Sequence, residues 1–231
     1  MSSALSVYYK NYLVQLEEAK KYFEENGTKP RLLLHACCGP CSSACLEQLC
    51  EYFDLSILFY NPNIYPEEEY CRRRDELKRF VADFLGKNAP IIIEENYNSA
   101  EFYSAIEKVP DFAVLSEKGE RCRVCYSIRM QKCAQYAQTG GYNFFTTTLS
   151  ISPHKDAEKI NGAGVLCQNE LQQKYGENAA KYLFADFKKK NGFKRSLELS
   201  ARFGLYRQDY CGCVFSMQNQ KQAVLAKNES L

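Results

Sequence analysis

The sequence predicts an α/β fold: a doubly wound, mostly parallel sheet with flanking helices and a helical N-terminal extension. Four short apolar runs, at 32–34, 57–60, 91–93 and 142–148, are continuous rather than alternating. Continuous apolarity over so few residues is typical of strands buried on both faces, as in a parallel sheet. Helical patterns lie between the runs, and this alternation of strand and helix favours the doubly wound arrangement.

The helical patterns follow in chain order. The first covers 8–25, where apolar residues recur at helical spacing ahead of the first strand. Pro66 followed by three glutamates favours the first turn of a second helix, and Asn98 with Glu101 favours the start of a shorter one. Two more helices are expected at 122–138 and 153–175. We therefore expect a helical N-terminal extension (1–29), an α/β catalytic domain with a metal centre (30–216) and a polar C-terminal tail (217–231).

The length of 231 residues is enough for one domain whose core needs no disulfides, yet the chain has twelve cysteines. No basic and apolar leader opens the sequence, and no run approaches the roughly 20 apolar residues of a membrane span. We expect a soluble, cytoplasmic protein with no membrane partner. In a reducing compartment, closely spaced cysteines are better interpreted as metal ligands or redox thiols than as crosslinks.

Two cysteine groups are spaced as metal ligands. Cys37, Cys38 and Cys41 follow the first expected strand, and Cys122 and Cys125 open a later helix. Residues just past the carboxyl ends of parallel strands meet at one edge of the sheet. Four thiolates can hold an iron–sulfur cluster or form a closed zinc site, and the arginines beside the helical pair favour the thiolate form.

The remaining cysteines have other interpretations. Five are scattered through helical patterns and are expected to be buried core residues: Cys45, Cys50, Cys71, Cys133 and Cys167. Residues 38–41 have the sequence Cys-Gly-Pro-Cys, which is also found in thioredoxin-like oxidoreductases and makes that class an alternative. This alternative leaves Cys122 and Cys125 without a role. Near the C-terminus, Cys211 and Cys213 flank a glycine, which favours a redox-active dithiol over a structural bridge.

Charge is unevenly distributed although the net charge is only +2. Eight bases and two acids lie between 181 and 207, and this segregation favours a polyanionic partner such as nucleic acid. The bases proposed to contact phosphates are Lys188, Lys189, Lys190 and Arg195. Two further segments carry polar groups: Asn61 and Asn63 are candidates for reading a substrate edge, and the region from Thr146 to Lys155 is a candidate anion site at a helix N-terminus.

Six motifs occur in order between about Leu32 and Ser216: H-A-C-C-G-P-C, Y-N-P-N-I-Y-P-x-x-E-Y, R-C-x-x-C-Y-x-x-R, T-T-T-L-x-x-S-P, D-F-K-K-K-x-G and Y-R-Q-x-Y-C-G-C. Together they resemble the QueH family of epoxyqueuosine reductases. Members remove the epoxide oxygen of epoxyqueuosine at the wobble position of tRNA, without cobalamin, in the last step of queuosine biosynthesis. The electron donor is not identified by the sequence.

The resemblance also implies cofactors and roles. It implies a [4Fe–4S] cluster held by Cys37, Cys38, Cys122 and Cys125, and a redox-active disulfide between Cys211 and Cys213. A second interpretation adds one iron beside the cluster, with Cys41 as its extra ligand. Candidate proton donors are Tyr60, Tyr126 and Asp186.

Two rivals belong to other classes. A zinc-stabilised RNA-binding module would use the same four cysteines as a structural zinc site and would catalyse no reaction. An ATP-dependent tRNA-thiolating enzyme would need a Ser-Gly-Gly-x-Asp-Ser loop where this chain has Cys37, Cys38, Gly39 and Pro40.

Overall fold

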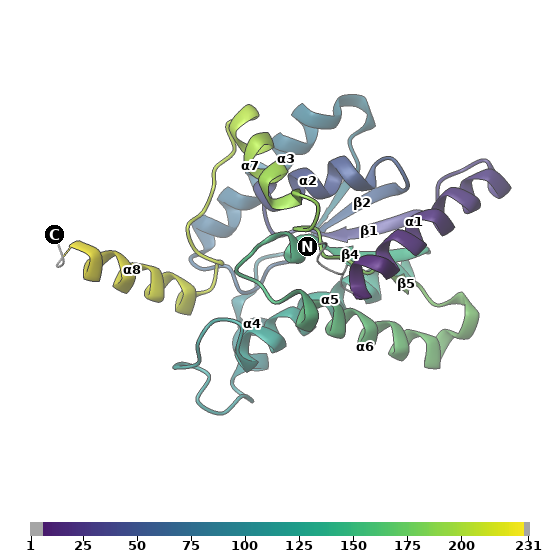
Figure 1. Cartoon of the computed structure of the whole chain (residues 1–231). Helices are drawn as coiled ribbons and strands as arrows, with labels where there is room; N and C mark the ends of the chain where they lie inside the picture. Colours follow the sequence, from purple (N-terminus) through teal and green to yellow (C-terminus); the bar gives the residue numbers. More distant parts are fainter. Residues whose placement is uncertain (1–6, 229–231) are drawn as a thin grey trace, which may run out of the picture.

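The sheet has five strands, all parallel, in the order β3-β2-β1-β4-β5 (Figure 1). The structure is a computed structural model that describes residues 7–228. The strands are β1 (Arg31–His35), β2 (Asp54–Phe59), β3 (Ile91–Glu94), β4 (Phe144–Thr147) and β5 (Lys181–Tyr182). The chain builds outward from β1 to β3, then returns to the other side of β1 and continues through β4. The predicted doubly wound α/β fold is confirmed, and its switch point lies between β1 and β4.

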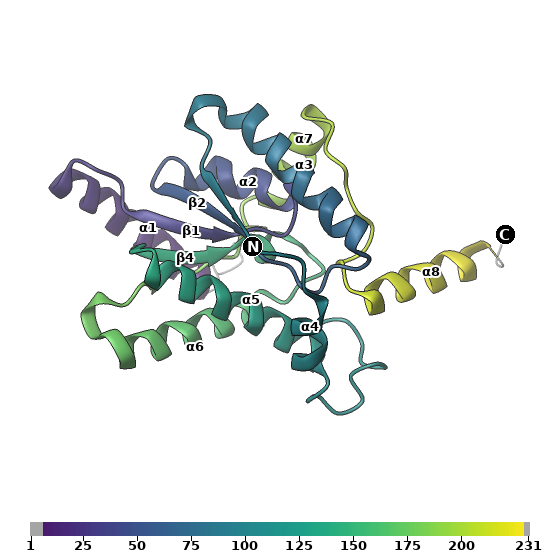
Figure 2. The same cartoon turned by 180° about the vertical axis from the view of Figure 1, so that it is seen from behind.

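Helices cover both faces of the sheet (Figures 1 and 2). On one face lie α2 (Gly39–Leu49), α3 (Glu67–Leu85) and α7 (Gly192–Arg202), and on the other lie α5 (Glu120–Thr139) and α6 (Ala157–Tyr175). The remaining α-helices are α1 (Val7–Asn26), α4 (Ser99–Ile106) and α8 (Val214–Asn228). The last of these extends away from the body of the molecule (Figure 1).

Two apolar layers account for the continuous apolar runs. Leu32 and Leu34 on β1 pack with residues of α1, α2 and α3, whereas Leu33 between them packs with residues of α5 and α6. Successive side chains of a strand point to opposite faces, so every position must be apolar when both faces are covered. The same alternation is seen on β2, where Ile57 and Leu58 belong to opposite layers.

Several boundaries differ from the sequence expectations. The helix expected from 153 begins at Ala157, because Asp156 caps it by accepting hydrogen bonds from the backbone N–H groups of Glu158 (3.0 Å) and Lys159 (3.2 Å). The strand β5 and the helix α7 were not expected, and α8 crosses the predicted boundary at 216 into the polar tail. Residues 1–6 and 229–231 of the two predicted end segments lie outside the described residues. The division into three segments stays a prediction.

Within residues 7–228, no helix has both the length and the apolarity to cross a membrane.

Candidate metal centre and substrate cavity

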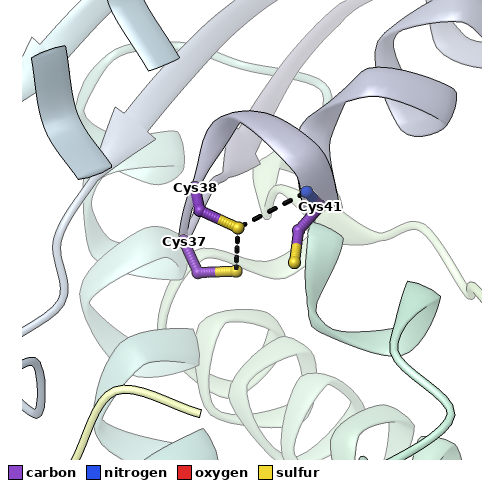
Figure 3. Close-up of side chains that lie close together, drawn as sticks. All are labelled: Cys37, Cys38 and Cys41. Atoms are coloured by element: carbon purple, nitrogen blue, oxygen red, sulfur yellow. Dashed lines mark hydrogen bonds between the residues drawn. The ribbon is translucent and has the colours of Figure 1, made fainter. Parts of the chain in front are cut away.

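Three thiols gather where β1 ends and α2 begins. The sulfur atoms of Cys37, Cys38 and Cys41 all lie within 4.8 Å of one another, and they point toward the same space (Figure 3). Cys38 is the N-cap of α2, with an extended backbone and a sulfur that accepts a hydrogen bond from the Cys41 N–H at 3.4 Å. Pro40 suits the first helical turn because it lacks an N–H that would need a partner. The Cys-Cys-Gly-Pro-Cys run thus concentrates three sulfurs in one turn of chain.

His35 fixes the strand ends beneath these thiols. It is fully buried on β1, and its ring nitrogens bond Thr147 Oγ1 at 2.8 Å and the Tyr60 carbonyl at 3.0 Å. Burial lowers the pKa of His35 to about 4, so the ring is neutral at pH 7. The imidazole therefore links the ends of β1, β2 and β4, and neither ring nitrogen is free to bind a metal.

A cavity of about 510 Å³ lies beside the three thiols. Its wall includes Cys41 from the first group, Cys122 and Cys125 from the first turns of α5, and Cys211 and Cys213 from the C-terminal segment. The fold therefore brings cysteines from three distant parts of the sequence to one cavity at the switch point. The sulfurs of the first group lie within 4.8 Å of one another, and the two cysteines of α5 and the two of the C-terminal segment line the adjoining cavity.

The strap, defined as residues 203–213, carries the C-terminal cysteine pair and is held by α3. Buried Arg73 donates hydrogen bonds to the carbonyl oxygens of Cys211 (3.1 Å) and Tyr210 (3.4 Å), and it pairs with Glu69 at 2.7 Å. Further along α3, Glu76 accepts a hydrogen bond from the Tyr206 N–H at 2.6 Å. These contacts determine where the strap crosses the molecule.

Two further contacts hold the strap, one to the first cysteine group and one to the loop before α3. Gln208 donates a hydrogen bond from Nε2 to the Cys38 sulfur at 3.0 Å, and the Gly212 carbonyl accepts one from the Tyr65 N–H at 2.8 Å. Gly212 has a φ of +127°, and a Cβ built there would lie 3.1 Å from Arg73 Nη1. Glycine is therefore favoured between the two cysteines, because any other residue would be strained at this φ and its Cβ would crowd Arg73.

Buried cations surround the cavity without carboxylate partners. Arg121 and Arg129 are each 1% exposed and Lys155 is 9% exposed, and none of the three forms an ion pair with a carboxylate of residues 7–228. Arg129 donates instead to the sulfur of Cys125 at 3.2 Å and to its carbonyl at 3.0 Å. Burying an uncompensated cation costs free energy. The negative charge that balances these three side chains must therefore come from the cysteine sulfurs or from a group that the sulfurs bind.

The thiols of the first group differ in acidity. Hydrogen bonds from the Cys38 and Cys41 thiols hold the pKa of Cys37 well below its ordinary value. Burial raises the pKa of Cys38 to about 12, and burial likewise raises that of Cys125 to about 11. One thiolate is thus favoured in the trio while its neighbours stay protonated, and a bound metal cation would be needed to ionise them together.

Comparison with known proteins identifies the family. A family model described as epoxyqueuosine reductase QueH matches residues 32–219. The chain belongs to the QueH family. It is 38% identical to the epoxyqueuosine reductase QueH of Streptococcus pyogenes serotype M1, over 91% of this chain and 79% of that protein. The Thermotoga maritima member is 34% identical, over 83% of this chain and 92% of that protein.

Among solved structures, the chain has some similarity to the U34-tRNA thiolase NcsA from Methanococcus maripaludis with its [4Fe-4S] cluster. The two are 11% identical with a TM-score of 0.44, covering 95% of this chain and 75% of that chain. At this level of similarity the thiolase adds nothing to the QueH assignment.

The two asparagines singled out in the sequence occupy different positions. Asn63 lines the cavity, whereas Asn61 is fully buried and donates a hydrogen bond to the Ala36 carbonyl at 2.9 Å. Of the candidate proton donors, Tyr126 lines the cavity. Tyr60 instead donates its hydroxyl hydrogen bond to Glu101, and Asp186 pairs with a lysine.

The cysteines expected in the core fall into two groups. Cys45, Cys133 and Cys167 are buried, while Cys50 and Cys71 are partly buried. Cys211 and Cys213 are both free thiols in this structure, so their disulfide stays a prediction.

The lysine-rich segment has mixed surroundings. Arg195 pairs with Glu47 at 2.7 Å and Glu198 at 3.0 Å, and Lys188 pairs with Asp186 at 2.9 Å. Lys190 lies over an aromatic ring, and Lys189 is exposed. Two of the four proposed phosphate contacts are therefore already engaged with carboxylates.

Sequence reasoning missed Arg73, which anchors the strap. A signal was available, because Arg73 interrupts the apolar stripe of α3 formed by Tyr70, Leu77 and Phe80. A single arginine in such a stripe, four residues after Glu69, indicates a buried charge with a structural partner.

Proposed function

We propose that this chain is an epoxyqueuosine reductase that converts epoxyqueuosine at the wobble position of tRNA to queuosine. The observation that supports this most strongly is the convergence of Cys41, Cys122, Cys125, Cys211 and Cys213 on one cavity in a chain of the QueH family. A cavity of about 510 Å³ is large enough to accept one modified nucleobase that has been turned out of the anticodon loop.

The proposed metal centre is a [4Fe–4S] cluster held by Cys37, Cys38, Cys122 and Cys125. The residues fit such a group, because the thiols supply a sulfur-only ligand set and the buried, unpaired Arg121, Arg129 and Lys155 would balance an anionic centre. When bound, the cluster would supply one-electron redox chemistry. Cys41 would hold an additional iron, which the closeness of its sulfur to those of Cys37 and Cys38 supports.

The Cys211 and Cys213 thiols are the proposed two-electron reductant. Both carbon–oxygen bonds of the epoxide break, a carbon–carbon double bond forms, and the oxygen leaves as water. Oxidation of the two thiols to one disulfide releases the two electrons and two protons that this conversion consumes. The strap would keep the pair at the cavity throughout. A separate electron donor would then reduce the disulfide.

Contacts between basic side chains and the phosphate backbone of the tRNA would hold the RNA outside the cavity. We propose that Lys188, Lys189, Lys190 and Arg195 contact phosphates. This requires Lys188 and Arg195 to exchange their carboxylate partners for the RNA. Reaction on tRNA would place the protein in the cytoplasm.

The proposed function is tested by measuring whether the protein converts epoxyqueuosine in tRNA to queuosine. Enzyme purified and reconstituted with iron and sulfide without oxygen is incubated with tRNA carrying epoxyqueuosine and a chemical reductant, and the tRNA is then digested to nucleosides for mass spectrometry. We expect a nucleoside lighter by one oxygen atom. Unchanged epoxyqueuosine with iron-loaded enzyme would contradict the proposed reaction, and zinc in place of iron would favour the structural RNA-binding alternative.

A further inference from the structure

Lys155 lies on the loop between β4 and α6, next to the switch point of the sheet. Its backbone N–H donates to the Ser152 carbonyl at 3.2 Å, and the His154 N–H bonds Ser152 Oγ at 3.3 Å. Asp156, the next residue, caps α6. The loop is therefore held by local hydrogen bonds on both sides of Lys155, and Lys155 lines the same cavity as the cysteines.

The surroundings of the Lys155 ammonium are unusual for a lysine. The residue is 9% exposed, and no carboxylate within residues 7–228 forms an ion pair with it. Its electrostatic neighbours are the thiols of Cys211, Cys37 and Cys41, together with Arg129, which repels it. A lysine side chain ordinarily carries its charge at pH 7, and the anionic metal centre proposed above would favour the charged form.

Groups on three elements lie within electrostatic range of this ammonium. Cys37 and Cys41 come from the start of α2, Cys125, Tyr126 and Arg129 from α5, and Cys211 from the strap. Lysine is rarely buried unless something pairs with it. The proposed cluster would satisfy part of this charge, yet Lys155 also lines the open space that a substrate would enter.

We propose that the Lys155 ammonium contacts the substrate and donates a hydrogen bond to the epoxide oxygen as that oxygen leaves. This inference rests on the proposed function. Breaking the carbon–oxygen bonds places negative charge on the oxygen, and a donor that is already charged and buried stabilises this charge without reorganisation. The two protons that convert the oxygen to water come from the Cys211 and Cys213 thiols, so Lys155 ends the cycle in the protonation state in which it began.

The experiment compares Lys155→Met, which keeps the apolar stem, with Lys155→Arg, which keeps the charge. Lys174→Met, near the C-terminal end of α6, is the control, because its side chain lies over Tyr175 and outside the cavity. Each protein is reconstituted without oxygen, and its iron, sulfide and visible absorbance are measured. Binding is then titrated with tRNA carrying epoxyqueuosine and with tRNA carrying queuosine, and the single-turnover rate is measured with pre-reduced enzyme.

We expect Lys155→Met to keep its iron and its affinity for queuosine tRNA, to bind epoxyqueuosine tRNA more weakly than the wild type does, and to lose about 100- to 1000-fold in single-turnover rate. Lys155→Arg should recover part of the rate, and Lys174→Met should match the wild type. Loss of iron in Lys155→Met would overturn the inference by showing that Lys155 is needed to hold the metal centre. Equal loss of affinity for both tRNAs would overturn it by showing that Lys155 contacts the RNA backbone rather than the epoxide. A wild-type rate in Lys155→Met would also overturn the inference, whereas failure of the wild type itself would overturn the proposed function.

Discussion

Replacing Arg73 should weaken the attachment of the strap to α3 next to Cys211. Arg73→Met keeps an apolar stem of similar length but removes the ion pair with Glu69 and the hydrogen bonds to the Cys211 and Tyr210 carbonyls. Because Arg73 is 1% exposed, water cannot replace these interactions. Among the side chains of residues 7–228, Glu69 would keep only the Tyr206 hydroxyl as a hydrogen-bond partner, at 3.2 and 3.3 Å.

The magnitude follows from the burial of the pair. Removing one partner of a buried ion pair costs about 3–5 kcal/mol, because the other charge is left uncompensated. The hydrogen bond to the Tyr210 carbonyl, at 3.4 Å, is long and adds little. With a urea m-value of about 2–3 kcal/mol per molar, the unfolding midpoint should fall by roughly 1–2.5 M. Arg73→Lys keeps the charge but cannot bridge both carbonyls, so it should fall between the wild type and Arg73→Met.

The assay is urea unfolding of the reconstituted protein followed by circular dichroism, together with the rate at which Cys211 is alkylated without urea. We expect faster alkylation of Cys211 in Arg73→Met, because its carbonyl anchor is gone. The matched control is Arg72→Met on the same helix, where an exposed guanidinium lies 3.3 Å from the centre of the Tyr206 ring. That change should cost about 1 kcal/mol or less. A midpoint in Arg73→Met equal to that of Arg72→Met would refute this reasoning.

Two further predictions concern the electron path and the tRNA. Cys211→Ser should keep its iron but fail in turnover, since only the dithiol is broken; iron analysis and nucleoside mass spectrometry check both, and loss of iron would assign Cys211 to the metal. Replacing Lys188, Lys189, Lys190 and Arg195 by glutamine should weaken binding to modified and unmodified tRNA alike, and should lower the salt slope by about 0.7–0.9 for each phosphate interaction that is removed. An unchanged slope would mean that the anticodon arm is held elsewhere.

The arrangement of strands could be predicted because it depends on local apolarity. Leu32 to Leu34 and Ile57 to Phe59 are continuous apolar runs, and only burial on both faces explains them. The two-residue strand β5 carried no such signal. The helix α7 is clearly amphipathic, but it follows directly on three lysines and was assigned to the basic segment. Both elements depend on packing against parts of the chain that are distant in sequence.

The site was only partly predictable for a related reason. The cysteines have spacings that reveal shared chemistry, and the predicted groups do meet at one cavity. The contacts of Arg73 and Gln208 are long-range, such as the hydrogen bond between Gln208 and Cys38, and no local pattern encodes them. The sequence could identify Lys155 as a candidate anion ligand, but it could not show that no carboxylate of residues 7–228 pairs with it.

The measurement that tests the central claim most directly is the iron content of matched cysteine variants after reconstitution without oxygen. Cys122 lines the cavity, whereas Cys167 is a buried core residue of α6 that packs against the sheet. If a metal–thiolate centre occupies this site, Cys122→Ala should lose its bound iron and visible absorbance, while Cys167→Ala should retain both. Full iron content in Cys122→Ala would contradict the account, because a ligand set that survives this change does not include Cys122.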